Sequence, residues 1–145
     1  MSIEVRDPWF LQKLAADVVL EGVVMNGSVR GPERVTEQIR TVVGLYRDYT
    51  LLWSADLGDR RVQEYTAVVD GRPVTGVGTF HLNPEGQVDH IVVNHRPLSA
   101  ALTVSRLLGE SPLGQHRDPN EFYRPTGQSY EDLVAYAATH GSANV

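Results

Sequence analysis

Apolar and polar positions alternate through the middle of the chain with the period of a half-buried β-strand. Runs rich in β-branched and aromatic residues cover residues 49–57, 61–69, 72–82 and 87–96. Asp70-Gly71, between the second and third runs, is the strongest short hairpin signal, because a type I′ turn needs positive φ at both central residues. The pattern therefore predicts a four-stranded antiparallel meander.

Helical spacing of apolar residues flanks this meander. Asp7-Pro8 predicts a short first helix that runs to Ala16, before a β-rich stretch over residues 18–24. Pro32 opens the clearest helix, whose apolar face recurs at helical spacing through Val35, Ile39, Val42, Val43 and Tyr46. Further helices are predicted over residues 98–108 and 129–140. This order predicts the α+β class, as a curved antiparallel sheet wrapped by helices that leaves an apolar cavity.

The pairing register decides which side chains share a face of the sheet, since side chains alternate along each strand. Pairing Val69 with Arg72, and Leu82 with Gln87, defines two faces. The face predicted to line the pocket carries Gln63, Tyr65, Ala67, Val74, Gly76, Gly78, Phe80, Ile91, Val93 and His95. The opposite, outer face carries Val77, Thr79, His81, Val88, His90 and Val92, which suits a partly solvated or dimer-forming surface.

The candidate catalytic residues on the pocket face are His95 and Tyr65. With a pKa near neutrality, His95 would serve as general acid or base, or else as a hydrogen-bonded histidine at a strand end. Tyr65 would donate a hydrogen bond to a carbonyl or enolate, or simply line the pocket. Gln63 would orient a ligand or lie at a strand end without a role. Residues Asp56 and Glu21 are further candidate acids, whose facing the sequence leaves open.

Metal and cofactor chemistry find no support in the sequence pattern. His81 and His90 share one face while His95 lies on the other, and no carboxylate completes a three-ligand set, so no metal site is predicted. The chain has neither a glycine-rich phosphate loop nor a serine-centred nucleophile elbow. No cofactor is predicted.

Composition narrows the classes of partner and compartment. The 145 residues include no cysteine, which excludes disulfides, thiolate metal sites and a cysteine nucleophile. A formal net charge of −5 argues against nucleic acid and anionic membranes as main partners. No signal peptide or long apolar run is visible, which predicts a cytoplasmic protein. Arginine almost replaces lysine, with Lys13 the single lysine, as in a GC-rich bacterial genome.

Several segments together resemble the SnoaL-like branch of the nuclear transport factor 2-like superfamily, over roughly residues 8–109. The segments that carry the resemblance are Asp17-Val18-Val19-Leu20-Glu21-Gly22, Arg30-Gly31-Pro32-Glu33-Arg34-Val35, Asp70-Gly71-Arg72-Pro73-Val74, Phe80-His81-Leu82-Asn83-Pro84-Glu85-Gly86-Gln87-Val88 and Asn94-His95-Arg96-Pro97-Leu98-Ser99-Ala100. The resemblance implies a cystatin-like cone, shared with ketosteroid isomerase and small polyketide cyclases.

The resemblance also shows where this chain departs from those enzymes. Gly22 matches the carboxylate base of ketosteroid isomerase, and Gly78 matches the acid of its oxyanion hole, so isomerisation by that mechanism is not expected. His95 falls near the aspartate base of the small polyketide cyclases, where a different general base would serve. The first helix is shortened, and the chain continues after the cone. The expected organisation is a cone domain over residues 1–110 and a C-terminal loop and helix over 111–145, packing on the same domain or on a partner subunit.

The expected function is binding of a small hydrophobic molecule of polyketide, steroid or terpenoid type. An enzyme of this kind would be a cofactor-free acid–base isomerase, cyclase, dehydratase or hydrolase, with His95 as proton carrier and Tyr65 as polarising donor. A non-catalytic ligand-binding or dimerisation module is the alternative, which the two missing carboxylates favour. A homodimer through the outer sheet face is expected in either case.

Overall fold

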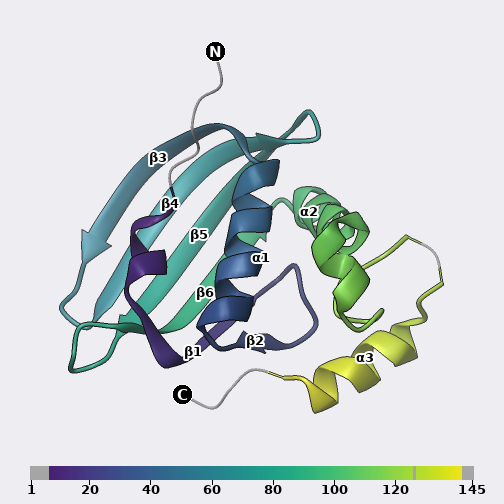
Figure 1. The fold of residues 1–145 in the computed structure, drawn as a ribbon. Helices are drawn as coiled ribbons and strands as arrows, with labels where there is room; N and C mark the ends of the chain where they lie inside the picture. Colours follow the sequence, from purple (N-terminus) through teal and green to yellow (C-terminus); the bar gives the residue numbers. More distant parts are fainter. Residues whose placement is uncertain (1–6, 126, 142–145) are drawn as a thin grey trace.

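The computed structural model describes residues 7–125 and 127–141, which form one curved six-stranded sheet with helices against it (Figure 1). The strands are β1 (Leu14–Gly22), β2 (Ser28–Arg30), β3 (Arg47–Asp56), β4 (Arg60–Val69), β5 (Arg72–Leu82) and β6 (Val88–Arg96). Their order across the sheet is β2-β1-β6-β5-β4-β3. The predicted meander is thus confirmed from β3 to β6, whereas β1 joins β6 in parallel, which the expected antiparallel sheet did not include.

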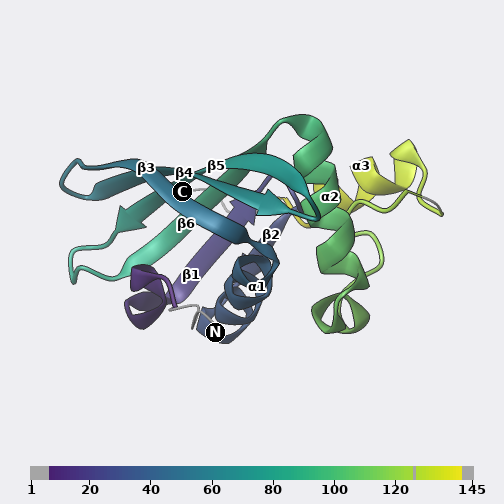
Figure 2. The ribbon, with the colours of Figure 1, turned by 90° about the horizontal axis from the view of Figure 1, so that it is seen from above.

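Helices α1 and α2 lie on the same face of the sheet (Figure 2). The helical segments are η1 (Trp9–Gln12), α1 (Pro32–Leu45), α2 (Leu98–Glu110), η2 (Pro112–His116) and α3 (Tyr130–Thr139). Helix α1 turns the predicted apolar face with Val35, Ile39 and Val42 into the core, and α2 contributes Val104 and Leu108. Because the sheet curves around these helices, the core and the site share its concave side.

The predicted first helix from Asp7 to Ala16 is wrong beyond a single 3₁₀ turn. Strand β1 already begins at Leu14, which pairs with Val88, and the backbone N–H of Val88 donates to the carbonyl of Lys13 at 2.7 Å. Asp7 does not cap a helix, since its carboxylate accepts two hydrogen bonds from Arg40 of α1 at 3.2 and 2.8 Å. The sheet pairing of Leu14 and the ion pair of Asp7 are both incompatible with a helix from Asp7 to Ala16.

The hairpin between β4 and β5 has the predicted register, with Val69 opposite Arg72 and Tyr65 opposite Gly76. Its turn has positive φ at Asp70 (50°) and Gly71 (75°), as a type I′ turn requires. This hairpin places the pocket face of β4 and β5 as the alternation of side chains predicted.

The predicted register of the next hairpin, between β5 and β6, is wrong by two residues. Gly78 lies opposite Val93 and Gly76 opposite His95, rather than opposite Ile91 and Val93. The Asn83 side chain accepts from the backbone of Glu85 and Gln87, which closes a wider loop, and the register shifts between His81 and Leu82. A two-residue slip keeps every side chain from His90 onward on its predicted face.

Val88 is the exception, because the irregularity lies between it and the rest of β6. It is fully buried in the core rather than placed on the outer face. The outer face of β5 and β6 is therefore formed by Val77, Thr79, His81, His90 and Val92 without it.

The C-terminal segment lies beside β2 and the turn that precedes it (Figure 1). The backbone of Asn26 donates to the carbonyl of Glu121 at 2.8 Å, and Ser28 donates to that of His140 at 2.9 Å. The Ser129 side chain caps α3 by accepting from the backbone of Asp132 at 3.1 Å. The described residues of this segment do not line the large cavity.

Within the described part of the chain, no helix is long and apolar enough to cross a membrane.

Candidate functional site

A cavity of about 970 Å³ lies between the concave face of the sheet and α1. Most of its wall is apolar or aromatic, from Trp9, Phe10, Leu20, Val24, Ile39, Val42, Tyr49, Phe80, Val93 and Leu108. The rings of Trp9, Phe10 and Phe80 pack together with centroids 4.7–5.7 Å apart, Trp9 and Phe10 edge to face and the other two pairs tilted. A wall of this kind takes up flat or branched hydrophobic molecules, and its few polar groups decide their orientation.

Three polar side chains meet in the wall of this cavity. The hydroxyl of Tyr46 is 2.6 Å from the hydroxyl of Tyr65 and 2.6 Å from Nε2 of His95. Tyr46 follows the last residue of α1, while Tyr65 and His95 come from β4 and β6. The three form a continuous hydrogen-bonded chain, called here the relay.

Gly76 of β5 makes the relay sterically feasible. It lies between the other two strand positions, opposite Tyr65 on one side and His95 on the other. A Cβ at Gly76 would collide with the Cζ and Oη atoms of the Tyr65 ring. The glycine therefore lets the tyrosine ring lie flat across β5 and reach Tyr46.

The relay is neutral at physiological pH because its members are buried. Burial lowers the pKa of His95 from its ordinary value to about 4 and raises the pKa of Tyr65 to about 12. Burial is also the main cause that raises the pKa of Tyr46 well above its ordinary value, followed by its electrostatic interaction and hydrogen bond with Tyr65. The expected near-neutral pKa of His95 is therefore wrong, since its imidazole has lost most of its hydration.

The hydrogen bonds of the relay have two consistent directions. When Nε2 of His95 accepts from Tyr46, Tyr46 accepts from Tyr65, and the Tyr65 oxygen keeps a lone pair for a ligand hydroxyl. When Nε2 carries the proton, it donates to the Tyr46 oxygen and Tyr46 donates to the Tyr65 oxygen. The O–H of Tyr65 is then available to donate to a ligand carbonyl. Nδ1 of His95 is buried and has no hydrogen-bond partner among the described residues. Tyr65 is therefore the member that offers either a donor or an acceptor.

The structure gathers most of the predicted pocket residues around the cavity. Gln63, Gly78, Phe80 and Val93 line it together with Tyr65 and His95. The Gln63 side chain accepts from the indole of Trp9 at 3.1 Å, which orients both. Four further predicted residues do not line the cavity: Ala67, Val74 and Ile91 are buried in the core, and Gly76 lies beneath Tyr65.

The candidate acids fall in different places. Asp56 is bound to Arg61 at 3.3 Å and to the backbone of Gly58 at 3.1 Å, outside the cavity wall. Glu21 borders the cavity, with one carboxylate oxygen 2.7 Å from Nε2 of His90. Among the described residues, no group of three histidines or carboxylates could hold a metal ion.

Two site residues were missed by sequence reasoning. Tyr46 was interpreted as one more core position on the apolar face of α1, and Gln38 was not singled out, yet both border the cavity. The signal for Tyr46 was its place at the end of the helix, where a hydroxyl on an apolar face needs a partner. The signal for Gln38 was a polar residue beside the buried face of α1.

Steric contacts explain why Gly22 and Gly78 stand where a carboxylate residue was considered. A Cβ at Gly22 would collide with the carbonyl oxygen of Val93 on the parallel neighbour β6. A Cβ at Gly78 would come within 3.2 Å of the Phe80 ring, which itself lines the cavity. This sheet therefore has no room at Gly22 for a carboxylate side chain.

Several solved structures share the architecture of this chain. No family model matches the chain, and no curated protein matches its sequence. A cystatin-like-fold protein from Silicibacter pomeroyi superposes with a TM-score of 0.67 and 18% identity, over 70% of this chain and 72% of that one. A steroid delta-isomerase from Pseudomonas aeruginosa gives 0.66 and 20%, over 69% and 74%. A nuclear transport factor 2-like protein from Cytophaga hutchinsonii gives 0.50 and 18%, over 62% and 75%.

The chain has the nuclear transport factor 2-like fold. In a protein with this fold, the sheet and α1 form a cone, and the relay and the cavity described above lie inside it. At these identities the likeness defines the fold, and the chemistry must be argued from the residues.

Proposed function

We propose that the protein binds a small, neutral hydrophobic molecule inside the cone and that the relay acts on one oxygen of that molecule. The observation that supports this is a chain of three buried polar side chains in the wall of a mostly apolar cavity. A buried polar group is costly unless it is paired, so a ligand oxygen at Tyr65 adds a partner where water is scarce. The ligands that match are polyketide-, steroid- or terpenoid-type molecules.

As an enzyme, the protein would use Tyr65 to polarise the ligand and His95 to carry the proton. A ligand hydroxyl gives its proton to Tyr65, Tyr65 gives its own to Tyr46, and Tyr46 gives its own to Nε2 of His95. The products are a ligand oxyanion and an imidazolium. A neighbouring negative charge favours the charged imidazole, so the pKa of His95 rises as the oxyanion forms. Run in reverse, the relay returns the proton from the imidazolium through Tyr46 and Tyr65 to a ligand oxyanion, such as the enolate of an isomerisation or the alkoxide of an aldol cyclisation. Neither direction needs a cofactor.

A non-catalytic binding module is the second candidate. It is favoured by Gly22 and Gly78, which stand where ketosteroid isomerase has carboxylates, and by the pKa of His95 of about 4, which makes it a weak base before ligand binds. In this case the relay would only orient the ligand.

The binding test uses 4-hydroxystilbene, a fluorescent phenol that would place its hydroxyl at Tyr65. The native protein should bind it, and Tyr65→Phe should weaken binding about fivefold or more, the usual contribution of one hydrogen bond. Tyr46→Phe should weaken it less, because Tyr65 keeps its hydroxyl. Tyr130→Phe, at a side chain 77% exposed, is the matched control. If the probe does not bind, or if Tyr65→Phe binds as the native protein does, the proposed site is wrong.

A second measurement separates enzyme from binding module. The enzyme should speed exchange of the α-hydrogens of 2-tetralone for deuterium, followed by NMR, because polarising a carbonyl promotes enolisation. Tyr65→Phe should lose at least tenfold of that acceleration, within the range for removing a polarising donor. Binding of 4-hydroxystilbene without any acceleration would instead establish the binding module.

We further propose a homodimer through the outer sheet face, which α1 and α2 leave uncovered (Figure 2). Thr79 lies near the middle of this face, opposite Val92 and next to the half-buried Val77 and His81. Thr79→Arg would introduce a charge that repels its symmetry mate. Light scattering should give a dimer for the native protein and a monomer for Thr79→Arg, with the exposed Gln115→Arg as control. A native monomer, or a dimer that survives Thr79→Arg, would contradict this interface.

A further inference from the structure

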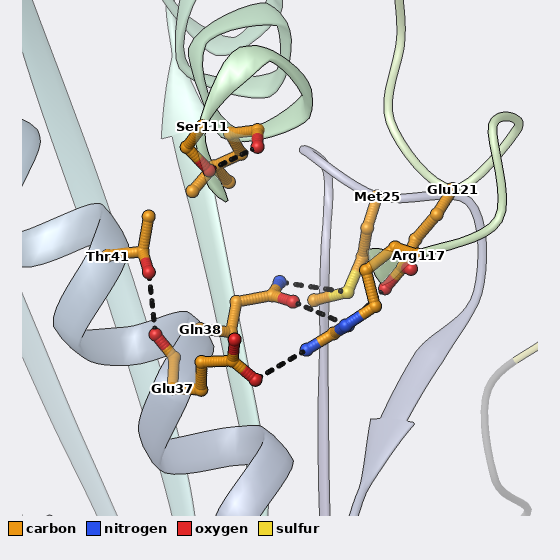
Figure 3. Close-up of polar contacts among 8 residues, drawn as sticks. Met25, Glu37, Gln38, Thr41, Ser111, Arg117 and Glu121 are labelled. Atoms are coloured by element: carbon orange, nitrogen blue, oxygen red, sulfur yellow. Dashed lines mark hydrogen bonds and ion pairs between the residues drawn. The ribbon is translucent and has the colours of Figure 1, made fainter. Parts of the chain in front are cut away.

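A further polar side chain borders the cavity, at the middle of α1. Gln38 is 2% exposed and belongs to the cavity wall. Its Oε1 accepts from Nη1 of Arg117 at 3.3 Å, and its Nε2 donates to the sulfur of Met25 at 3.3 Å (Figure 3). Gln38 is thus held from two sides, by the C-terminal segment and by the chain just after β1.

Arg117 fixes which end of the amide faces which neighbour. A guanidinium only donates hydrogen bonds, so the amide oxygen must face Arg117 and the NH₂ group must face the other way. Arg117 cannot move away easily, because its side chain is only 4% exposed and its Nη1 is paired with Glu121 at 2.6 Å. Its Nη2 is buried and has no hydrogen-bond partner among the described residues, with Glu37 3.9 Å away. The ion pair therefore holds Gln38 in a single orientation.

Among the described residues, the NH₂ group of Gln38 has no strong acceptor. The partner of Nε2 is a thioether sulfur, which accepts hydrogen bonds weakly. Met25 also borders the cavity, so a molecule inside it reaches the same neighbourhood. An oxygen atom of a ligand would be a better acceptor for this buried donor than the sulfur is.

We propose that Gln38 is a second ligand contact, which donates a hydrogen bond to an acceptor oxygen at the end of the ligand remote from Tyr65, and that Arg117 is its positioning residue. This inference rests on the proposed function and adds a ligand class to it. Gln38 precedes Tyr46 by eight residues along α1, which corresponds to about 12 Å of helical rise. The ligand is therefore elongated and neutral, with a hydroxyl or carbonyl at one end and a carbonyl or ether oxygen at the other.

The hydrogen bonds of Gln38 also determine which ligand groups would not bind at this end of the cavity. Gln38 presents an N–H group, so a ligand group that only donates finds no acceptor there. A cationic ammonium group likewise only donates, so it too would be left without an acceptor at Gln38. Specificity at this end comes from leaving the wrong ligand group unpaired in a dry site.

The test compares two fluorescent probes of nearly equal shape, 4-hydroxy-4′-methoxystilbene and 4-hydroxy-4′-ethylstilbene. Both carry the phenol for Tyr65, and only the methoxy compound has an acceptor at the far end. The native protein should bind the methoxy probe about fivefold more tightly, as one additional hydrogen bond implies. Gln38→Leu should bring the ratio of the two dissociation constants to about one. Equal affinities in the native protein, or an unchanged ratio in Gln38→Leu, would overturn the proposal.

The role of Arg117 is tested by the same ratio of the two dissociation constants. A general loss of stability would weaken both probes and leave this ratio unchanged. Arg117→Met should lower the ratio although Gln38 is still present, and Arg117→Lys should restore part of it by supplying a donor. Because Arg117→Met leaves Glu121 buried without its partner, the double variant Arg117→Met/Glu121→Leu removes the whole ion pair and guards against unfolding. A native ratio in a folded double variant would show that Arg117 does not position Gln38.

The matched control is Gln63→Leu, the same exchange at the other glutamine of the cavity wall. It should change both affinities together and leave their ratio as it is. The outcomes also separate this inference from the proposed function. If neither probe binds, the proposed function fails, whereas two probes that bind equally and both depend on Tyr65 leave that function standing and reject the role of Gln38.

Discussion

Gly22→Ala is expected to destabilise the protein by about 3 kcal/mol, the upper end of the usual cost of overfilling a packed interior. The added methyl group would collide with the carbonyl oxygen of Val93 and lie 3.0 Å from its carbonyl carbon. Strand β6 cannot retreat, because it is hydrogen-bonded to β1 on one side and β5 on the other. The measurement is the free energy of unfolding from urea denaturation.

The control for this prediction is Gly44→Ala in α1, where a Cβ would meet no atom within 4 Å. Alanine is the better helix former, so this variant should be as stable as the native protein or slightly more stable. Gly22→Asp, which would place a carboxylate at this position, should unfold the protein rather than supply a base. A Gly22→Ala variant of native stability would mean that β1 and β6 are further apart than described.

The second prediction concerns pH, and its cause is the burial of His95. The native pKa of about 4 lies below the ordinary value of 6.5, so between these limits the unfolded chain binds more protons than the folded one. The stability contributed by the neutral imidazole is complete above pH 6.5 and is lost as the pH falls towards 4. At about 1.4 kcal/mol per pH unit, the loss is about 3 kcal/mol.

His95→Gln isolates this contribution, because an amide does not titrate but still accepts a hydrogen bond from Tyr46. The unfolding free energy of the native protein minus that of the variant should fall by about 3 kcal/mol from pH 7 to pH 4, because only the native protein loses the contribution of the neutral imidazole. Glu121 acts in the opposite sense, since burial raises the pKa of its carboxyl, but it is present in both proteins and cancels. His116→Gln removes an exposed imidazole as control. A pH-independent difference would show that His95 is hydrated in the folded protein.

The fold was predictable because most of its signals are local. The Asp70-Gly71 turn determines its own backbone conformation, and strands β4 and β5 then follow in register. The apolar face of α1 is equally local, and it was predicted. The first helix was mispredicted because Leu14 is drawn into the sheet by Val88, a residue distant in sequence.

The site was predictable only in part. Tyr65 and His95 were assigned to one face because alternation survives a two-residue slip of register. Their connection through Tyr46 could not be foreseen, since that residue comes from a helix whose angle to the sheet no local pattern specifies. The contact of Arg117 with Gln38 depends in the same way on how the C-terminal segment returns to α1.

The sequence by itself thus determined the fold class, the main turns and which strand residues face the cone, because backbone preferences and side-chain alternation act between near neighbours. Only the tertiary structure decided the parallel pairing of β1 with β6, the relay through Tyr46, the hydrogen bond from Arg117 to Gln38 and the low pKa of His95. Each of these depends on distances and burial among segments far apart in the chain, which arise only when the sheet closes around its helices.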